Sequence, residues 1–143
     1  MDAERRQPLL TMPSQPTSGD IHAVLSAHQQ WMASFRQGDA DGMAAHYAET
    51  GQLLPAYSAA INGQAAIEAF WQGCIDMGIY AMQRTPREVD CLGETVNEVG
   101  EYRFLDRHNR VLDIGKYVVI WKWQQGQWQI QHDIWTSNLP SGL

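Results

Sequence analysis

Basic side chains are scarce in this sequence. Its 143 residues carry 10 Lys and Arg side chains against 16 Asp and Glu side chains, so the formal net charge is −6. Nucleic acids and anionic membrane surfaces are bound by clustered Lys and Arg. The composition therefore argues against a nucleic-acid partner and against a membrane partner.

Cysteine is also rare. Cys74 and Cys91 are the only two cysteines, and they form no CxxC pair. The five histidines show neither HxH nor HxxxH spacing. We therefore predict two reduced thiols in a core, no metal site and no cofactor.

Long hydrophobic runs are missing as well. No apolar run approaches the ~20 residues that a membrane span requires. The start of the chain, MDAERRQPLLTMPSQPTSGD, has no apolar segment followed by a small-residue cleavage site, so it is not a secretory signal. These absences predict a cytoplasmic protein. Residues 1–19 are rich in Pro, Ser, Thr and Gln, and we expect a disordered leader there, followed by one domain over residues 20–140.

Apolar and aromatic residues are plentiful, with 44% hydrophobic residues and six Trp, which is typical of a globular domain. Asp20 is a good N-cap for a first helix, and Gly38 is suited to the left-handed position after its end. A second helix is predicted to carry Tyr47 and to end at Gly51, before a short strand over 52–55. A third helix is predicted from about Gly63. The apolar face of the first helix comprises Ile21, Val24, Leu25, His28, Trp31, Met32 and Phe35.

The second half of the chain reads as strands. Residues 79–92, 95–105, 111–124 and 127–137 show strand patterns and are separated by short segments rich in turn formers. Short connections favour an antiparallel meander. Helices followed by strands indicate an α+β fold in which the helices cover one face of a curved sheet.

The last strand, WQIQHDIWTSN (128–138), places His132 and Asp133 side by side among tryptophans. Regular alternation puts Gln131, Asp133 and Trp135 on one face and His132 on the other. Asp133 then belongs either to a solvent-facing surface or to the wall of a cavity. For His132, the favoured position is the outer sheet face or a subunit interface.

Three segments of the chain resemble one family in the same order: RQGDADGMAAHYAETGQLLP, INGQAAIEAFW and GKYVVIWKWQQGQWQIQHDIW. They resemble the NTF2-like superfamily, and within it the SnoaL-like and DUF4440 group that is related to the ketosteroid isomerases. The resemblance implies a cone in which three N-terminal helices pack on a strongly curved antiparallel sheet, with a pocket open at one end. This fold hosts isomerases, dehydratases, cyclases, hydrolases and dimerisation modules, so it does not fix a function.

The resemblance also implies where the steroid isomerase residues would stand. Pro55 occupies the position of the proton-shuttling Asp, and Trp31 occupies that of the oxyanion Tyr. Since proline has no proton to exchange, we expect no steroid Δ-isomerase activity. The supporting tyrosine positions fall on Trp71 and on the retained Tyr47. The protonated Asp of the oxyanion hole matches Asp113.

We therefore predict that the chain binds a small apolar or aromatic molecule. Asp133 and Asp113 are the candidate proton-transfer groups, for isomerase, hydratase or cyclase chemistry next to a carbonyl. The alternative is a non-catalytic ligand-binding or dimerisation module. The predicted pocket lining is Trp31, Tyr47, Tyr57, Trp71, Tyr117, Gln131 and Trp135.

Three further expectations concern charge and surface. Arg84 and Arg87 are expected to be exposed, although either could meet a carboxylate substrate. An apolar outer sheet face predicts a homodimer. If Asp133 is a pocket acid, Asp133→Asn should leave the fold intact, whereas unfolding would mark Asp133 as a structural anchor.

Overall fold

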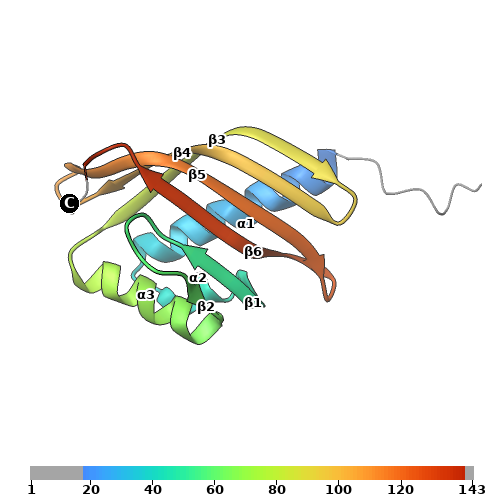
Figure 1. Cartoon of the computed structure of the whole chain (residues 1–143), viewed down its shortest axis with the longest axis horizontal. Coiled ribbons are helices and arrows are strands. Elements are labelled where there is room, and N and C mark those ends of the chain that lie inside the picture. The colour runs from blue at the N-terminus through green and yellow to red at the C-terminus, as the bar shows by residue number, and fades with distance from the viewer. Residues whose placement is uncertain (1–17, 141–143) are drawn as a thin grey trace, which may run out of the picture.

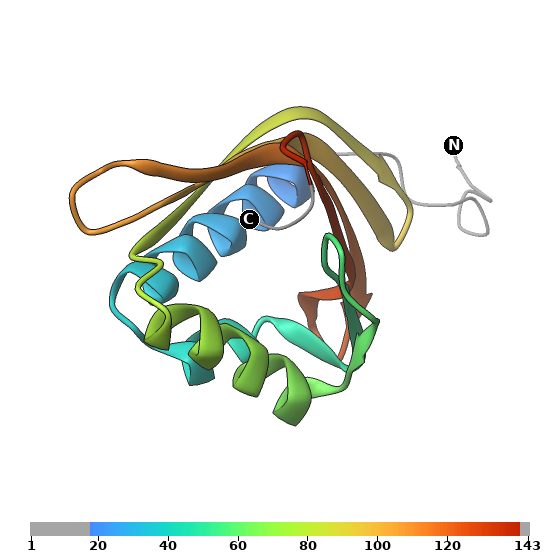
Figure 2. The same ribbon diagram turned by 60° about the vertical axis from the view of Figure 1, so that its left-hand side comes forward.

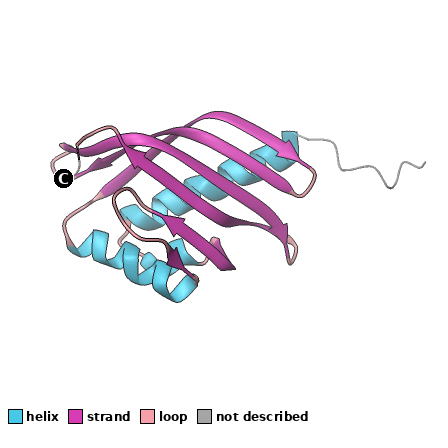
Figure 3. Ribbon diagram, viewed as in Figure 1, coloured by secondary structure: helices cyan, strands magenta, loops and turns pink. Residues whose placement is uncertain are grey.

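Three helices lie on one face of a bent sheet in the computed structural model, which describes residues 18–140 (Figures 1 and 2). They are α1 (Ser18–Arg36), α2 (Ala40–Ala44) and α3 (Gln64–Asp76). Figure 3 shows the two layers, with the helices grouped on one side of the strands. The predicted α+β architecture is confirmed. Residues 1–17 of the predicted leader lie outside the described residues.

The sheet has six strands in the order β2-β1-β6-β5-β4-β3. Strands β3 to β6 form the predicted antiparallel meander, whereas β1 runs parallel to β6. The predicted bounds of β4, β5 and β6 are those observed. The strands are β1 (Tyr47–Leu54), β2 (Ile61–Asn62), β3 (Ala81–Leu92), β4 (Thr95–Leu105), β5 (Val111–Gln124) and β6 (Gln127–Ser137).

The predicted second helix is too long. Helix α2 ends at Ala44, and Tyr47 already opens β1. Gly51 lies inside β1, where the pairing with β6 shifts register between Tyr47 and Gln52. A Cβ on Gly51 would lie 2.9 Å from the carbonyl oxygen of Ala48. The glycine that reads as a helix end therefore serves a bulge, which glycine also favours.

The first helix begins at Ser18, so Asp20 lies in its first turn instead of at its N-cap. A carboxylate in the first turn still complements the helix dipole. Gly38 has a φ of +74°, which confirms the predicted left-handed residue after this helix. None of the helices within residues 18–140 combines the length and apolar character that a membrane-spanning helix needs.

A bulge in β6 changes which side chains share a face. Ile130 pairs with Trp121 and His132 pairs with Ile120, so Gln131 is an extra residue between them. Ile130 and Asp133 are consequently both fully buried, while His132 is partly exposed. The predicted orientation of His132 away from Asp133 is confirmed. The prediction that Gln131 shares the face of Asp133 is wrong, because regular alternation stops at the bulge.

Two glycines make room for tyrosine rings on the concave face. Gly100 pairs with Tyr117 and Gly115 pairs with Tyr102 across β4 and β5. A Cβ on Gly100 would lie 2.7 Å from the Tyr117 hydroxyl, and one on Gly115 would lie 2.8 Å from the Tyr102 hydroxyl. Each ring therefore lies across its glycine, which directs the two phenols toward buried carboxylates.

Candidate functional site

Asp133 is fully buried and has two polar partners. The Tyr47 hydroxyl donates a hydrogen bond to Oδ2 at 2.6 Å. The Arg84 Nη1 atom lies 2.9 Å from Oδ1, and both side chains of this ion pair are inaccessible to solvent. Arg84 was expected to be exposed, and that prediction is wrong. The expected exposure of Arg87 is confirmed, since its side chain is 60% exposed.

The Arg84 guanidinium is enclosed by aromatic rings. Its Cζ atom lies 4.6 Å from the centre of a Trp31 ring, 4.7 Å from Tyr117 and 5.5 Å from Trp135. These contacts favour a buried cation through the negative ring faces. The alternation of β3 could have predicted the burial of Arg84. Met82 and Arg84 lie on the same face of the strand, and Met82 belongs to the core.

Tyr47 stays a hydrogen-bond donor in this environment. Burial raises the pKa of its phenol well above the ordinary value, and the adjacent Asp133 carboxylate raises it further. The Trp71 indole donates to the same hydroxyl at 3.2 Å. Trp71 also meets Trp31 edge to face at 5.4 Å and stacks on Trp135 at 5.4 Å. Aromatic rings thus pack around the ion pair from several sides.

A second buried carboxylate, Glu98, was missed by the sequence analysis. It is fully buried and accepts hydrogen bonds from the Tyr117 hydroxyl at 2.6 Å and the Trp121 indole at 3.1 Å. His28 Nδ1 lies 2.8 Å from Oε2 and 2.9 Å from Oε1. Burial by itself raises the pKa of Glu98, but the bonds from these three side chains outweigh it and hold the pKa below its ordinary value.

The sequence did hold a signal for Glu98. It alternates with Val96 and Gly100, which are both buried on the concave face of β4. An acidic residue in phase with a buried apolar pattern is rarely left unpaired.

A cavity with a mostly apolar lining lies apart from both carboxylates just described. It has a volume of about 300 Å³ and is bordered by the loop after β1, by α3 and by the ends of β4, β5 and β6. We call it the mouth cavity. Its lining is mostly apolar and consists of Pro55, Ala56, Tyr57, Ser58, Phe70, Cys74, Met77, Ile79, Phe104, Asp113, Trp135 and Ser137.

Asp113 is the only ionisable carboxylate in this lining, and it is 3% exposed. Its Oδ1 atom accepts hydrogen bonds from the Ser137 hydroxyl at 2.5 Å and the Ile114 backbone N–H at 2.9 Å. Its Oδ2 atom accepts one from the Tyr102 hydroxyl at 2.9 Å. Burial raises the pKa of Tyr102, and the bond to Asp113 raises it further, so this phenol remains a donor. A carboxylate oxygen accepts two hydrogen bonds, and Oδ2 accepts one from the described residues.

Tyr57 stands at the rim of the mouth cavity. Its side chain is 62% exposed, and its hydroxyl donates to the Leu139 backbone oxygen at 2.6 Å. The residue has a φ of +58°, an uncommon conformation for a non-glycine residue. The bond ties the loop after β1 to the segment after β6.

The structure divides the predicted site residues into three groups. Asp113, Tyr57 and Trp135 line the mouth cavity. Gln131 lies apart from them and donates to the backbone oxygen of Thr50 at 3.1 Å. The remaining members are buried in the interior around Arg84, and they are Asp133, Trp31, Tyr47, Trp71 and Tyr117.

Both thiols are free. Cys91 is buried in the core, as predicted, whereas Cys74 is only partly buried and borders the mouth cavity. Burial raises the pKa of the Cys74 thiol to about 11. Residues 18–140 contain no cluster of three His, Cys, Asp or Glu side chains able to hold a metal ion.

The family model of the SnoaL-like domain matches residues 28–130. The chain belongs to the SnoaL-like domain family. This confirms the NTF2-like part of the resemblance, while the narrower DUF4440 relation stays a prediction. No curated protein matches the sequence.

Solved structures share the fold of this SnoaL-like domain at low sequence identity. An NTF2-like protein from Novosphingobium aromaticivorans is 15% identical with a TM-score of 0.77, over 87% of this chain and 85% of its own. An NTF2-like protein of unknown function from Pseudomonas putida KT2440 is 21% identical with a TM-score of 0.73, over 90% and 92% of the two chains. A ketosteroid isomerase-like protein from Erwinia carotovora atroseptica is 13% identical with a TM-score of 0.73, over 87% and 100%. At these identities the likeness concerns the fold alone.

Proposed function

We propose that this SnoaL-like domain binds a small, largely apolar or aromatic molecule in the mouth cavity, with Asp113 as its polar anchor. The observation that carries the proposal is a buried carboxylate in a cavity of about 300 Å³ whose lining is otherwise mostly apolar. Cavities of this size and character are the usual sites of small ligands.

The lining indicates what such a ligand must look like. Phe70, Phe104 and Trp135 offer ring surfaces to an apolar body. Three donors already bond to the Asp113 carboxylate. A carboxylate accepts hydrogen bonds and donates none. A ligand hydroxyl or amine group next to the apolar body would complete the bonding of Oδ2.

A panel of small aromatic molecules tests the proposal. Molecules with a hydroxyl or amine substituent should raise the melting temperature and change tryptophan fluorescence, because Trp135 borders the cavity. Asp113→Asn should weaken binding by about tenfold or more, the usual loss when a charged acceptor is replaced.

The matched control is Thr136→Ala, since Thr136 is exposed beside Trp135 and does not line the cavity. It should bind like the wild type. Equal binding by Asp113→Asn and the wild type would show that Asp113 is not the anchor. A panel that leaves the melting temperature unchanged would reject the binding function.

Proton transfer next to a carbonyl is the second candidate function, of the isomerase, hydratase or cyclase kind. It is favoured by the contact of Asp113 with an apolar cavity, where water competes little for a carbonyl substrate. Asp133 supports it less well, because it is ion-paired with Arg84 and does not border this cavity. Pro55 lines the cavity at the position that the resemblance assigns to the isomerase base, so steroid isomerisation is not part of the proposal.

We further propose that the domain forms a homodimer through the outer face of the sheet. Figure 2 shows the helices on the inner side only, which leaves the outer side of the sheet without a covering layer. Val118, Ile120 and Ile134 point to that outer side and are partly exposed. A partner copy would remove this apolar surface from water.

Sedimentation tests the dimer. The wild type should sediment as twice the 16.2 kDa chain at micromolar concentration, and Ile134→Glu should sediment as the monomer, because it places a charge in the contact. Ala69→Glu, a change at an exposed position of α3, should leave the dimer intact. A wild-type monomer at that concentration would contradict the proposal.

A further inference from the structure

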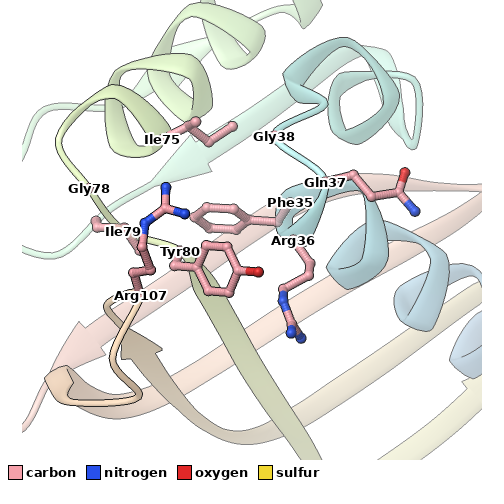
Figure 4. A pocket seen from close by; sticks show the side chains of 9 residues that line it. All are labelled: Phe35, Arg36, Gln37, Gly38, Ile75, Gly78, Ile79, Tyr80 and Arg107. Atoms are coloured by element: carbon pink, nitrogen blue, oxygen red, sulfur yellow. The ribbon is translucent and has the colours of Figure 1, made fainter.

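A second pocket lies at the end of α1, beside the connection between α3 and β3 (Figure 4). It has a volume of about 220 Å³ and we call it the arginine pocket. Figure 4 shows Arg36 and Arg107 on either side of the Tyr80 ring. The complete lining is Phe35, Arg36, Gln37, Gly38, Ile75, Gly78, Ile79, Tyr80 and Arg107.

Among the arginines that the structure describes, Arg36 and Arg107 lack the acidic or amide partners that the other four have. Within residues 18–140, neither guanidinium is within bonding distance of a carboxylate. The lining of the pocket contains no acidic residue either. Elsewhere in the described chain, Arg84 is paired with Asp133, Arg87 with Glu101, Arg103 with Gln83, and Arg110 with Asp106.

The two cations converge on Tyr80 from different elements. The Arg36 Cζ atom lies 4.9 Å and the Arg107 Cζ atom 5.4 Å from the centre of the Tyr80 ring. A hydrogen bond and the positive charge of Arg36, with a smaller effect of Arg107, lower the pKa of the Tyr80 phenol. A protein with a net charge of −6 thus has a local region of positive charge here.

The lining of the arginine pocket also includes apolar side chains. Phe35 is 1% exposed and belongs to the core, and Ile75 and Ile79 pack against that core. A ligand in this pocket would therefore meet both carbon surface and guanidinium groups. Arginine is suited to carboxylates because its planar fork can donate two parallel hydrogen bonds.

We propose that the arginine pocket binds a small hydrophobic carboxylate, with its apolar body on Phe35, Ile75 and Ile79 and its carboxylate on Arg36 or Arg107. This site is separate from the mouth cavity, although Ile79 borders both. The proposal therefore does not depend on the proposed function. A bound acid would neutralise charges that have no counterion within the described residues.

Titration of the full chain with benzoate, followed by NMR, tests the proposal. Benzoate should shift the signals of Ile75, Ile79 and Tyr80, and its affinity should fall as salt is added, because exposed charges are screened. Arg36→Gln and Arg107→Gln should each weaken benzoate binding. The loss should be about tenfold for the arginine that holds the carboxylate. Arg110→Gln is the matched control, since Arg110 is exposed near Arg107 but pairs with Asp106, and it should bind like the wild type.

Two further probes test the charge and the apolar body of the ligand separately. Benzyl alcohol has an apolar body without a charge, and inorganic phosphate has a charge without an apolar body. Benzyl alcohol should bind about tenfold more weakly than benzoate, because it lacks the charge. Inorganic phosphate should also bind more weakly, because it has no apolar body. Equal affinity for phosphate would overturn the hydrophobic part, and unchanged benzoate binding in both arginine variants would overturn the site. Asp113→Asn changes the mouth cavity and should leave benzoate binding at the arginine pocket unaffected. Failure of the mouth-cavity proposal can therefore be distinguished from failure of the arginine-pocket proposal.

Discussion

Asp133→Asn is expected to lower the free energy of unfolding by about 3–5 kcal/mol, because it leaves Arg84 as a buried cation without its counter-charge. Both side chains of the pair are inaccessible to solvent, so water cannot replace the lost carboxylate. The Tyr47 hydroxyl would also lose a charged acceptor. Urea unfolding followed by tryptophan fluorescence measures the change.

The double variant Arg84→Met/Asp133→Asn separates the cost of an unpaired charge from the value of the pair. Removing both charges should recover much of the lost stability, since buried ion pairs are often replaceable by apolar groups. Asp90→Asn, at an exposed position of β3, should change stability by no more than about 0.5 kcal/mol. An Asp133→Asn protein as stable as the wild type would contradict a structural role for the ion pair.

The sequence alone favours the opposite result for Asp133→Asn. Tryptophan neighbours make Asp133 look like a poorly solvated acid kept for chemistry, and such an acid can be neutralised without loss of stability. The reason for the difference is Arg84, which lies 49 residues earlier in the chain by its numbering and was expected at the surface. Side-chain periodicity shows which face a residue occupies, but it does not show which distant charge faces it.

Much of the fold was predictable because it rests on local patterns. The bounds of β4, β5 and β6 follow from alternation between turn-rich segments. The end of α1 just before Gly38 follows from the tolerance of glycine for positive φ. Gly51 was misread, because a glycine signals a helix end and a strand bulge equally well, and only the pairing of β1 with β6 decides between them.

The candidate site was predictable to a smaller extent. Asp113 was identified only through the resemblance, and in the structure it is buried beside the mouth cavity. Gln131 was placed with Asp133 because a bulge has no local sequence signature strong enough to reveal it. Glu98 was overlooked because acidic residues are usually exposed. These three positions depend on register and on contacts between distant segments.

The interior of this SnoaL-like domain contains two buried carboxylate clusters, one around Asp133 and one around Glu98. Arg84 contacts the Tyr117 ring, and the Tyr117 hydroxyl donates to Glu98, so the two carboxylate clusters share one tyrosine. Burial and the neighbouring Glu98 carboxylate raise the pKa of Tyr117, which keeps its phenol protonated as a donor. Changes at Glu98 should therefore also affect the surroundings of Arg84.

Glu98→Gln is expected to lower the free energy of unfolding at neutral pH by about 1.5–3 kcal/mol, the usual value of hydrogen bonds to a charged group. An amide oxygen can accept from only some of the donors that surround Glu98, and its NH₂ group would face donors. Glu101→Gln is the matched control on the same strand, because Glu101 is exposed and its pair with Arg87 lies in solvent. It should change stability by about 1 kcal/mol or less.

The wild type and Glu98→Gln should differ in the free energy of unfolding by an amount that depends on pH. This dependence tests whether the Glu98 carboxylate causes the difference. The folded pKa of Glu98 lies below its ordinary value of 4.5, so its contribution is fully present above pH 4.5 and is lost as pH falls through the folded pKa. His46 adds a separate change: burial is the main cause of its lowered pKa, so stability also falls as pH drops below 6.5. His46 is present in both proteins, so the difference between wild type and Glu98→Gln removes its effect. That difference should shrink as the pH falls below about 4.5, where the Glu98 carboxylate becomes protonated. A difference that stays constant down to the acid unfolding of the wild type would show that the Glu98 charge does not stabilise the fold.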